Sequence, residues 1–257
     1  MKYILQFLET LNYAVGSLSF VRRHRLYIGF WKYGWVTKVL IALAIIVGLK
    51  LFLVFLDWQS SGFILTDGED RTSIGEVLKE SIQDSYAYLF DGSLKYIILL
   101  LMEVVIFHIC RKTLEVIGDI KSETSFKVFA RAQGRMVGVT FMCYGLEIAA
   151  TVVINTAFGF VPVLDFLEPV AVLLAHLFFL GFVILDNYNE QFHVKVRDSL
   201  KLGGRYAGVT VGLGAMVSLL LYLPLLGAVL APIIASVAAT RVMYDISDLH
   251  LRYDNKS

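Results

Sequence analysis

Hydrophobic residues form six long blocks, and polar segments of different lengths stand between most of them. The blocks cover residues 34–56, 93–110, 136–161, 162–185, 206–223 and 225–244. Each block approaches the length of about 20 residues that an α-helix needs to cross a bilayer. Segments of about ten residues with alternating polarity, which are typical of an outer-membrane barrel, do not occur. The pattern therefore predicts an all-α, polytopic membrane protein with a single membrane domain over residues 1–257.

The segments between the blocks alternate between many and few basic residues. Residues 1–33 carry five Lys and Arg against one acid, whereas residues 57–92 carry two against eight acids. Residues 111–135 and 186–205 are rich in Lys and Arg again. Short loops rich in Lys and Arg stay in the cytoplasm. The sequence therefore predicts a multi-pass protein of the inner (plasma) membrane with both termini cytoplasmic.

Two polar segments contain apolar stripes at helical spacing. In the N-terminal segment the stripe consists of Ile4, Leu8, Leu11, Val15 and Leu18. It predicts an interfacial amphipathic helix on the cytoplasmic face, with the basic run RRHR at residues 22–25 near the lipid headgroups. The second stripe predicts an amphipathic helix inside the acidic outer loop 57–92, where it packs on protein.

All four prolines of the chain stand in two similar apolar stretches. They are Pro162, Pro169, Pro224 and Pro232. The first proline of each pair is expected to end a helix and the second to begin the returning one. Gly159 and Gly227 allow the backbone to turn. Residues 136–185 and 206–244 are thus predicted to be two helical hairpins, whose tips either emerge on the outer side or stop within the membrane.

The C-terminal part of the chain, from residue 180 to residue 245, carries a set of structural motifs. They are Asp186 and Asn187 after the fourth block, a glycine-rich fifth block, PLL at 224–226, Pro232, and AAT ending at Thr240. Together with FVP at 160–162 they resemble the CysZ-type sulfate permeases of the etoposide-induced protein 2.4 superfamily. The resemblance implies two full transmembrane helices, two half-penetrating hairpins, assembly into a homo-oligomer, and transport of sulfate.

One stretch departs from the pattern of that family. Sulfate-permease members carry a Gly–apolar–Arg-Arg run after the N-terminal helix, whereas this chain has RRHRLYIGF at residues 22–30. Two functions are therefore open. The first is a permease or channel for sulfate or a similar small oxyanion, with or without proton linkage. The second is a non-transporting membrane scaffold or partner-binding protein of the same superfamily.

Two acids and a histidine within the apolar blocks are candidates for proton or ion coupling. Glu103 and Glu147 lie near the middle of the second and third blocks, and His108 lies one to two turns from Glu103. Charged residues at this depth are costly and are a functional hypothesis by default. The alternative is a hydrogen-bonded packing contact with Lys50 or a tyrosine. Apart from Lys50, no Lys or Arg is expected deep in a block.

Because few basic residues are expected deep in the blocks, a transported anion would have to be bound by the partial positive charge at helix N-termini. The helix starts expected after the second proline of each pair would offer unpaired N–H groups to an oxyanion. A cluster of arginines would collect the anion at the cytoplasmic mouth. This hypothetical pathway comprises Arg22, Arg23, Arg25, Gly159, Pro162, Pro169, Pro224, Gly227 and Pro232.

The sequence predicts neither an enzyme nor a resident cofactor or metal. It contains no GxSxG, HExxH or phosphate-loop motif, and Glu190 and His193 alone make a weak metal half-site. The net charge of +1 indicates no nucleic-acid partner. The expected partners are the lipid bilayer, a small inorganic anion and further copies of the chain.

Overall fold

A computed structural model describes residues 1–29, 94–120, 126–160, 166–221, 223 and 226–254, together with four single positions between residues 39 and 46. These residues form helices and connecting turns, and no strand occurs among them. Apart from those four positions, the first apolar block lies outside the described residues, and so does the whole acidic outer loop. The same holds for Lys50, Pro162 and Pro224, so the predictions made for them stay predictions.

Three helices in the described part of the chain are long and apolar enough to cross a membrane. The spans are Arg131–Gly159, Glu168–Gln191 and Leu226–Ile246, and a fourth is obtained if a bent pair of helices counts as one. Together with the helical content, these spans are compatible with the membrane protein that the sequence predicts.

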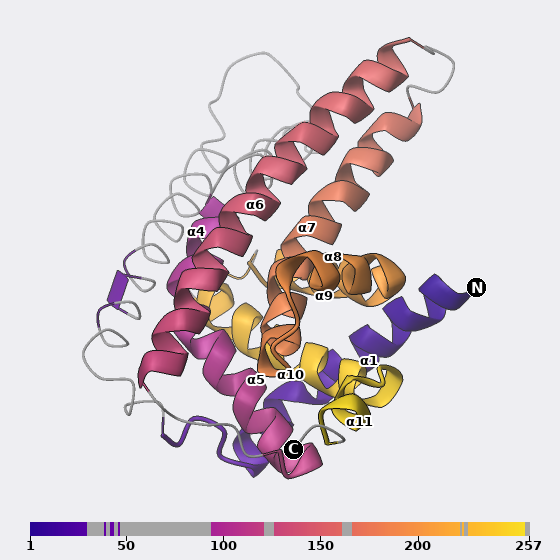
Figure 1. Ribbon diagram of the computed structural model, residues 1–257. Coiled ribbons are helices and arrows are strands. Elements are labelled where there is room, and N and C mark those ends of the chain that lie inside the picture. Colours follow the sequence, from indigo (N-terminus) through magenta and orange to yellow (C-terminus); the bar gives the residue numbers. More distant parts are fainter. Residues whose placement is uncertain are drawn as a thin grey trace, which may run out of the picture.

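The first predicted hairpin consists of helix α6 (Phe126–Gly159) and helix α7 (Glu168–Gln191). Its distal half projects beyond the other helices in Figure 1. Pro169 lies in the first turn of α7, as predicted. The distal half exposes large apolar side chains, such as Val153 and Phe160. An exposed apolar surface of this kind is suited to contact with lipid.

The second predicted hairpin consists of helix α9 (Ala207–Leu221) and helix α10 (Leu226–Ile246). It differs from the first in length, because the 15 residues of α9 rise only about 22 Å. A short helix, α8 (Val196–Arg205), precedes α9 at an angle of 92°. The short helix α11 (Leu249–Asp254) follows α10. The two hairpins are therefore less alike than their prolines suggest.

Pro232 does not begin the returning helix, so this prediction is wrong. Helix α10 starts six residues earlier and contains Pro232 in its interior. The turn closes sooner because Gly227 donates its backbone N–H to Leu223 O at 2.8 Å. A Cβ at Gly227 would lie 2.0 Å from Leu220 O, so only glycine permits this approach. Pro232 offers no N–H to the preceding turn and is not a helix N-terminus.

Helix α7 forms the centre of the fold, as its position between α6, α8 and α9 in Figure 1 shows. All residues from Leu180 to Asn189 are buried. Backbones approach closely here, because a Cβ at Gly181 would lie 1.8 Å from Thr210 O of α9. A Cβ at Gly214 of α9 would likewise lie 1.8 Å from Leu177 O. Glycines thus fix the packing of α7 on α9, as expected for membrane helices.

The N-terminal helix α1 (Lys2–Arg23) packs on α9 and α10 with the face opposite to its apolar stripe. Its buried side chains include Gln6, Thr10 and Ser17, whereas most of the stripe is exposed. The reason is the close approach at Gly208 of α9, where a Cβ would lie 2.0 Å from Tyr3 O. Small and polar side chains fit there and large ones do not. The apolar stripe is left mostly exposed.

A hydrogen bond and cation–π contacts connect α1 to α10. The Tyr13 phenol donates to Asp245, and the Arg241 guanidinium lies 4.7 Å from the centroid of the Tyr13 ring and 5.0 Å from that of Phe20. The hydrogen bond to the Asp245 carboxylate, together with burial, raises the pKa of Tyr13. The N-terminal helix is therefore an integral part of the helical body.

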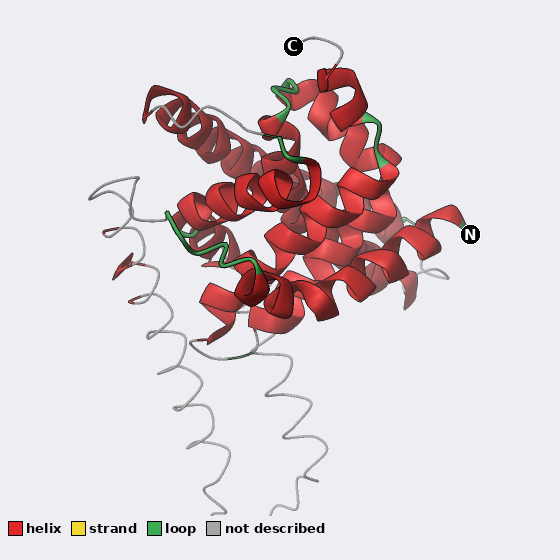
Figure 2. Ribbon diagram, turned by 90° about the horizontal axis from the view of Figure 1, so that it is seen from below, coloured by secondary structure: helices red, strands yellow, loops and turns green. Residues whose placement is uncertain are grey.

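Helices α4 (Leu94–Leu101) and α5 (Glu103–Gly118) replace the single helix expected from the second apolar block. Met102 separates them, and its carbonyl accepts backbone hydrogen bonds from Val105 and Ile106, both at 2.9 Å. Figure 2 shows the bundle from below, with the described helices packed together. The break places Glu103 at the first position of α5, in the protein interior.

Candidate functional site: buried polar clusters

The first buried cluster joins α4, α6 and α7 around the Glu147 carboxylate. Lys95 Nζ donates to Glu147 Oε1 at 2.5 Å, and His176 Nδ1 lies 2.5 Å from the same oxygen. The Tyr96 hydroxyl donates to Glu147 Oε2. Lys95, Glu147 and His176 expose 1%, 3% and 6% of their surface. We call these four residues the lysine cluster.

The lysine cluster balances its charges within the protein. Glu147 stands near the middle of the α6 span, where an unpaired charge would be most costly. The Lys95 ammonium supplies the opposite charge, and its Nζ also lies 3.5 Å from His176 Nδ1. The Tyr96 ring is 5.4 Å from Nζ. The cluster thus combines a buried cation with two groups, the carboxylate and the imidazole, that can take up a proton.

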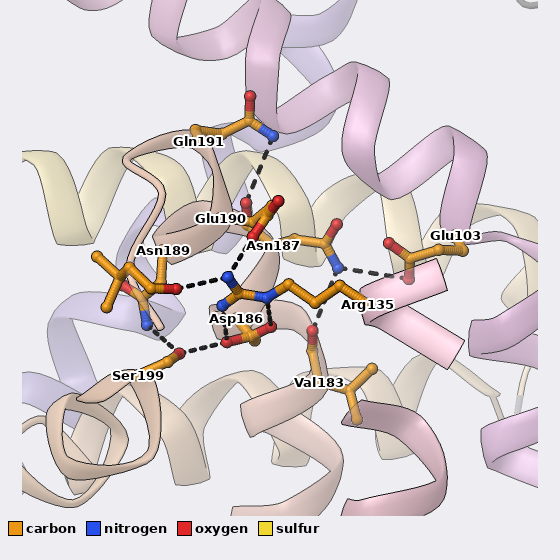
Figure 3. A network of polar contacts seen from close by, with 10 residues as sticks. Glu103, Arg135, Val183, Asp186, Asn187, Asn189, Glu190, Gln191 and Ser199 are labelled. Atoms are coloured by element: carbon orange, nitrogen blue, oxygen red, sulfur yellow. Dashed lines mark hydrogen bonds and ion pairs between the residues drawn. The ribbon is translucent and has the colours of Figure 1, made fainter. Parts of the chain in front are cut away.

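A second cluster surrounds Arg135 of α6, as Figure 3 shows. Arg135 Nη2 donates to Asp186 Oδ1 at 2.8 Å and Nε donates to Oδ2 at 3.2 Å. Its Nη1 donates to Val194 O at 2.5 Å and pairs with Glu190. Asp186 also accepts a hydrogen bond from Ser199 of α8. We call this set the arginine cluster, and it ties α6 to the end of α7 and to α8.

Glu103 of α5 lies beside Asn187 of α7, next to the arginine cluster (Figure 3). Asn187 Nδ2 donates to Glu103 Oε2 at 3.4 Å and to Val183 O at 3.2 Å. Both side chains are buried. Among the contacts found in the described residues, no cation pairs with Glu103. Its surroundings therefore differ in kind from those of Glu147.

The candidate coupling residues do not form one site in the described structure. Glu103 and Glu147 belong to different clusters, although the sequence suggests a common depth. His108 belongs to neither, because its Nε2 lies 3.0 Å from Leu26 O, in the turn after α1. For Glu147 the alternative interpretation holds in part, since Tyr96 is a hydrogen-bond partner.

The residues of the hypothetical anion pathway are also spread over the fold. The three arginines at positions 22, 23 and 25 are exposed at the end of α1 and in the following turn. Gly159 ends α6, and Pro169 lies at the start of α7. Gly227 is buried in the first turn of α10. Within the described ranges, no ion pair or backbone hydrogen bond joins the arginines to the hairpin ends.

The structure shows two basic residues, one buried and one partly buried, that the sequence patterns did not single out. Lys95 and Arg135 stand at the edges of their apolar blocks and are drawn into the interior by Glu147 and Asp186. The sequence prediction that Lys50 alone lies deep in a block concerned position along the chain, and it did not anticipate that Lys95, at a block edge, is buried in the protein. A search for basic residues within one turn of a block's end could have found both.

The part of the chain that the structure describes contains no group of three His, Cys, Asp or Glu side chains suited to a metal ion. The arrangement can instead bind and release protons and pair small ions with Lys95.

The fold and the buried clusters define the class: an all-helical protein with helices suited to cross a membrane and with ionisable groups in its interior. Comparisons with protein-family models, with curated proteins and with solved structures find no match for this chain. The resemblance to sulfate permeases therefore remains a prediction from the sequence.

Proposed function

We propose that the protein is a membrane permease for a small oxyanion of the sulfate type, and that the lysine cluster is its ion site. One observation carries the proposal: the buried Lys95 ammonium pairs with the Glu147 carboxylate at 2.5 Å, near the middle of the α6 span. Ionisable groups at membrane depth are costly and are by default a hypothesis for an ion or proton pathway. A buried Lys is the charge that an anion pathway needs.

The chemistry of the cluster links an anion to a proton. While Glu147 is ionised, its carboxylate pairs with the Lys95 ammonium and prevents an anion from binding there. A proton on Glu147 removes that competition, and an oxyanion can then accept hydrogen bonds from Lys95 and from the Tyr96 hydroxyl. His176 contacts both Lys95 and Glu147, so it can pass the proton to the carboxylate. Anion and proton would bind together, which limits the charge buried at each step.

Further parts of the sequence-based hypothesis belong to the same proposal. The permease would lie in the inner membrane as a homo-oligomer, with both termini in the cytoplasm and the exposed arginines of α1 at the entrance. The α9–α10 hairpin would be the half-penetrating one, because α9 rises about 22 Å and the hydrocarbon core is about 30 Å thick. The start of α7 at Pro169 remains a candidate anion contact, whereas Pro232 does not.

Uptake of labelled sulfate into vesicles that contain the purified protein tests this function. We expect saturable uptake that an inward proton gradient stimulates. Lys95→Met should abolish it, because the charge that binds the anion is gone. Glu147→Gln should make uptake independent of the proton gradient.

Lys112→Met is the matched control. Lys112 lies on α5 and pairs with Glu115 at the surface, with 32% of its side chain exposed, so this variant should transport like the wild type. Full uptake by Lys95→Met would overturn the role of the lysine cluster. Absence of flux for sulfate, sulfite and phosphate would overturn the permease and favour the non-transporting scaffold.

A further inference from the structure

The Glu103 carboxyl group is buried without a cationic partner in the described structure. It exposes 1% of its surface, and Asn187 beside it exposes none. The hydrogen bond from Asn187 Nδ2 to Glu103 Oε2 is long, at 3.4 Å. A buried carboxylate that lacks both an opposite charge and strong hydrogen bonds is costly. The charge state of Glu103 therefore needs an explanation.

Two buried oxygen atoms of this pair have no hydrogen-bond partner among the residues that the structure describes. They are Glu103 Oε1 and Asn187 Oδ1. In Figure 3 the carboxyl and amide groups face each other, and these two atoms lie on the same side of the dashed line that joins the groups. If Glu103 were ionised, both atoms would be acceptors without a donor between them. A single proton on Oε1 supplies that donor.

The surrounding charges also disfavour an ionised Glu103. Asp186 and Glu190 of α7 both act on it as negative charges. Arg135 of α6 is already paired with these two acids. On α5 itself the buried Cys110 thiol interacts electrostatically with Glu103 and adds no positive charge. An ionised Glu103 would thus add a third negative charge beside the two acids that Arg135 already pairs with.

We propose that Glu103 and Asn187 form a proton-binding site, an acid–amide pair closed by two hydrogen bonds. Glu103 Oε1–H donates to Asn187 Oδ1, and Asn187 Nδ2–H donates to Glu103 Oε2. The proton satisfies both unpartnered oxygens at once, and its release leaves two acceptors facing each other across the contact between α5 and α7. The site does not rest on the permease proposal, because it needs no transported substrate.

Infrared difference spectroscopy of the purified protein in lipid tests the pair. The wild type should show the C=O stretching band of a protonated carboxylic acid at neutral pH, and the band should disappear at alkaline pH. Glu103→Gln should remove the band. Glu190→Gln is the matched control and should retain it, because Glu190 is an ionised partner of Arg135. A wild-type spectrum that Glu103→Gln does not change would overturn the proposal.

Asn187→Leu provides a second variant. It should move the band to higher frequency, because the acid loses its amide partner, and an unmoved band would contradict the pairing. If Glu103→Gln does not fold, the change in band frequency in Asn187→Leu still tests whether the protonated Glu103 is paired with Asn187.

Thermal unfolding at different pH values and in different salts gives an independent test. The wild type should lose stability relative to Glu103→Gln as the pH rises, because the unfolded chain accepts an ionised Glu103 and the folded interior does not. A sodium ion between the two oxygens is the competing occupant. Stabilisation by sodium chloride over choline chloride in the wild type, absent in Glu103→Gln, would overturn the proton site in favour of a sodium site.

Discussion

Glu103 and Glu147 are both buried carboxyl groups in apolar segments, yet the fold gives them opposite partners. Glu147 accepts hydrogen bonds from Lys95 and Tyr96, and His176 touches the same carboxylate. Glu103 receives one long hydrogen bond from Asn187. The first environment stabilises the ionised form and the second stabilises the protonated form. At rest, the same residue type can therefore be the ionised partner of a lysine in one half of the interior and a protonated acid in the other.

The difference arises from which helices bring charged residues to each acid. Lys95 is the second residue of α4, and it reaches Glu147 because α4 packs on α6. On the other side, Arg135 pairs with Asp186 and Glu190, so that Asn187 is the hydrogen-bond partner of Glu103 found among the described residues. If this comparison is right, a substitution that breaks the ion pair of Glu147 or of Arg135 should lower the free energy of unfolding strongly. A substitution that replaces the uncharged Glu103 by another uncharged side chain should lower it little.

The largest effect is expected for Glu147→Leu, which removes the carboxylate that pairs with the buried Lys95 ammonium. Removal of one partner of a buried ion pair costs about 3–5 kcal/mol. Denaturation in lipid or detergent micelles, followed by circular dichroism, measures this change in the free energy of unfolding. The double variant Lys95→Met, Glu147→Leu should recover most of the loss, because no charge is left unpaired. A double variant as unstable as the single one would contradict the ion pair.

A somewhat smaller effect, about 3 kcal/mol, is expected for Arg135→Leu. Asp186 would remain buried with only Ser199 as a donor, whereas Glu190 is partly exposed and can be hydrated. The matched control is Arg131→Leu on the same helix, where the side chain is exposed. It should change stability by no more than about 0.5 kcal/mol. Equal stability of the two variants would show that the arginine cluster contributes nothing.

Hydrophobic block lengths and the proline positions predicted much of the helical architecture. The spans of α6 and α7 and the place of Pro169 follow from apolar length and from the missing N–H of proline. The interior position of Pro232 did not follow, because the turn is set by Gly227 approaching a backbone oxygen. Contacts of this kind depend on two segments meeting and leave no mark in a hydrophobic pattern.

The candidate site was predicted less completely than the fold. Sequence singled out Glu103 and Glu147 because acids in apolar blocks are rare, but their partners come from other helices. Lys95 and Arg135 stand at block edges, where snorkelling to the surface is the usual expectation. The burial of the apolar-poor face of α1 was missed for a similar reason: the glycines of α9 decide which face fits.

Asn187→Leu should destabilise the protein by about 1–3 kcal/mol. It removes the amide that the Glu103 carboxyl faces, and Val183 O loses a side-chain donor at the same time. The loss should be greater at alkaline pH, where an ionised Glu103 would have no donor at all. Unfolding measured at two pH values tests this, and a loss that is the same at both would argue against an acid–amide pair.

The smallest effect is expected for Glu103→Gln, at most about 0.5 kcal/mol at neutral pH. A glutamine amide can donate to Asn187 Oδ1 and accept from Asn187 Nδ2, so it reproduces both hydrogen bonds of the protonated acid. Glu147→Gln is the informative counterpart, because the same exchange removes the charge that balances Lys95. Glu147→Gln should therefore lower the free energy of unfolding clearly more than Glu103→Gln does in the same assay. If the two variants lost equal stability, Glu103 and Glu147 would share one charge state, and the contrast between the two acids would be wrong.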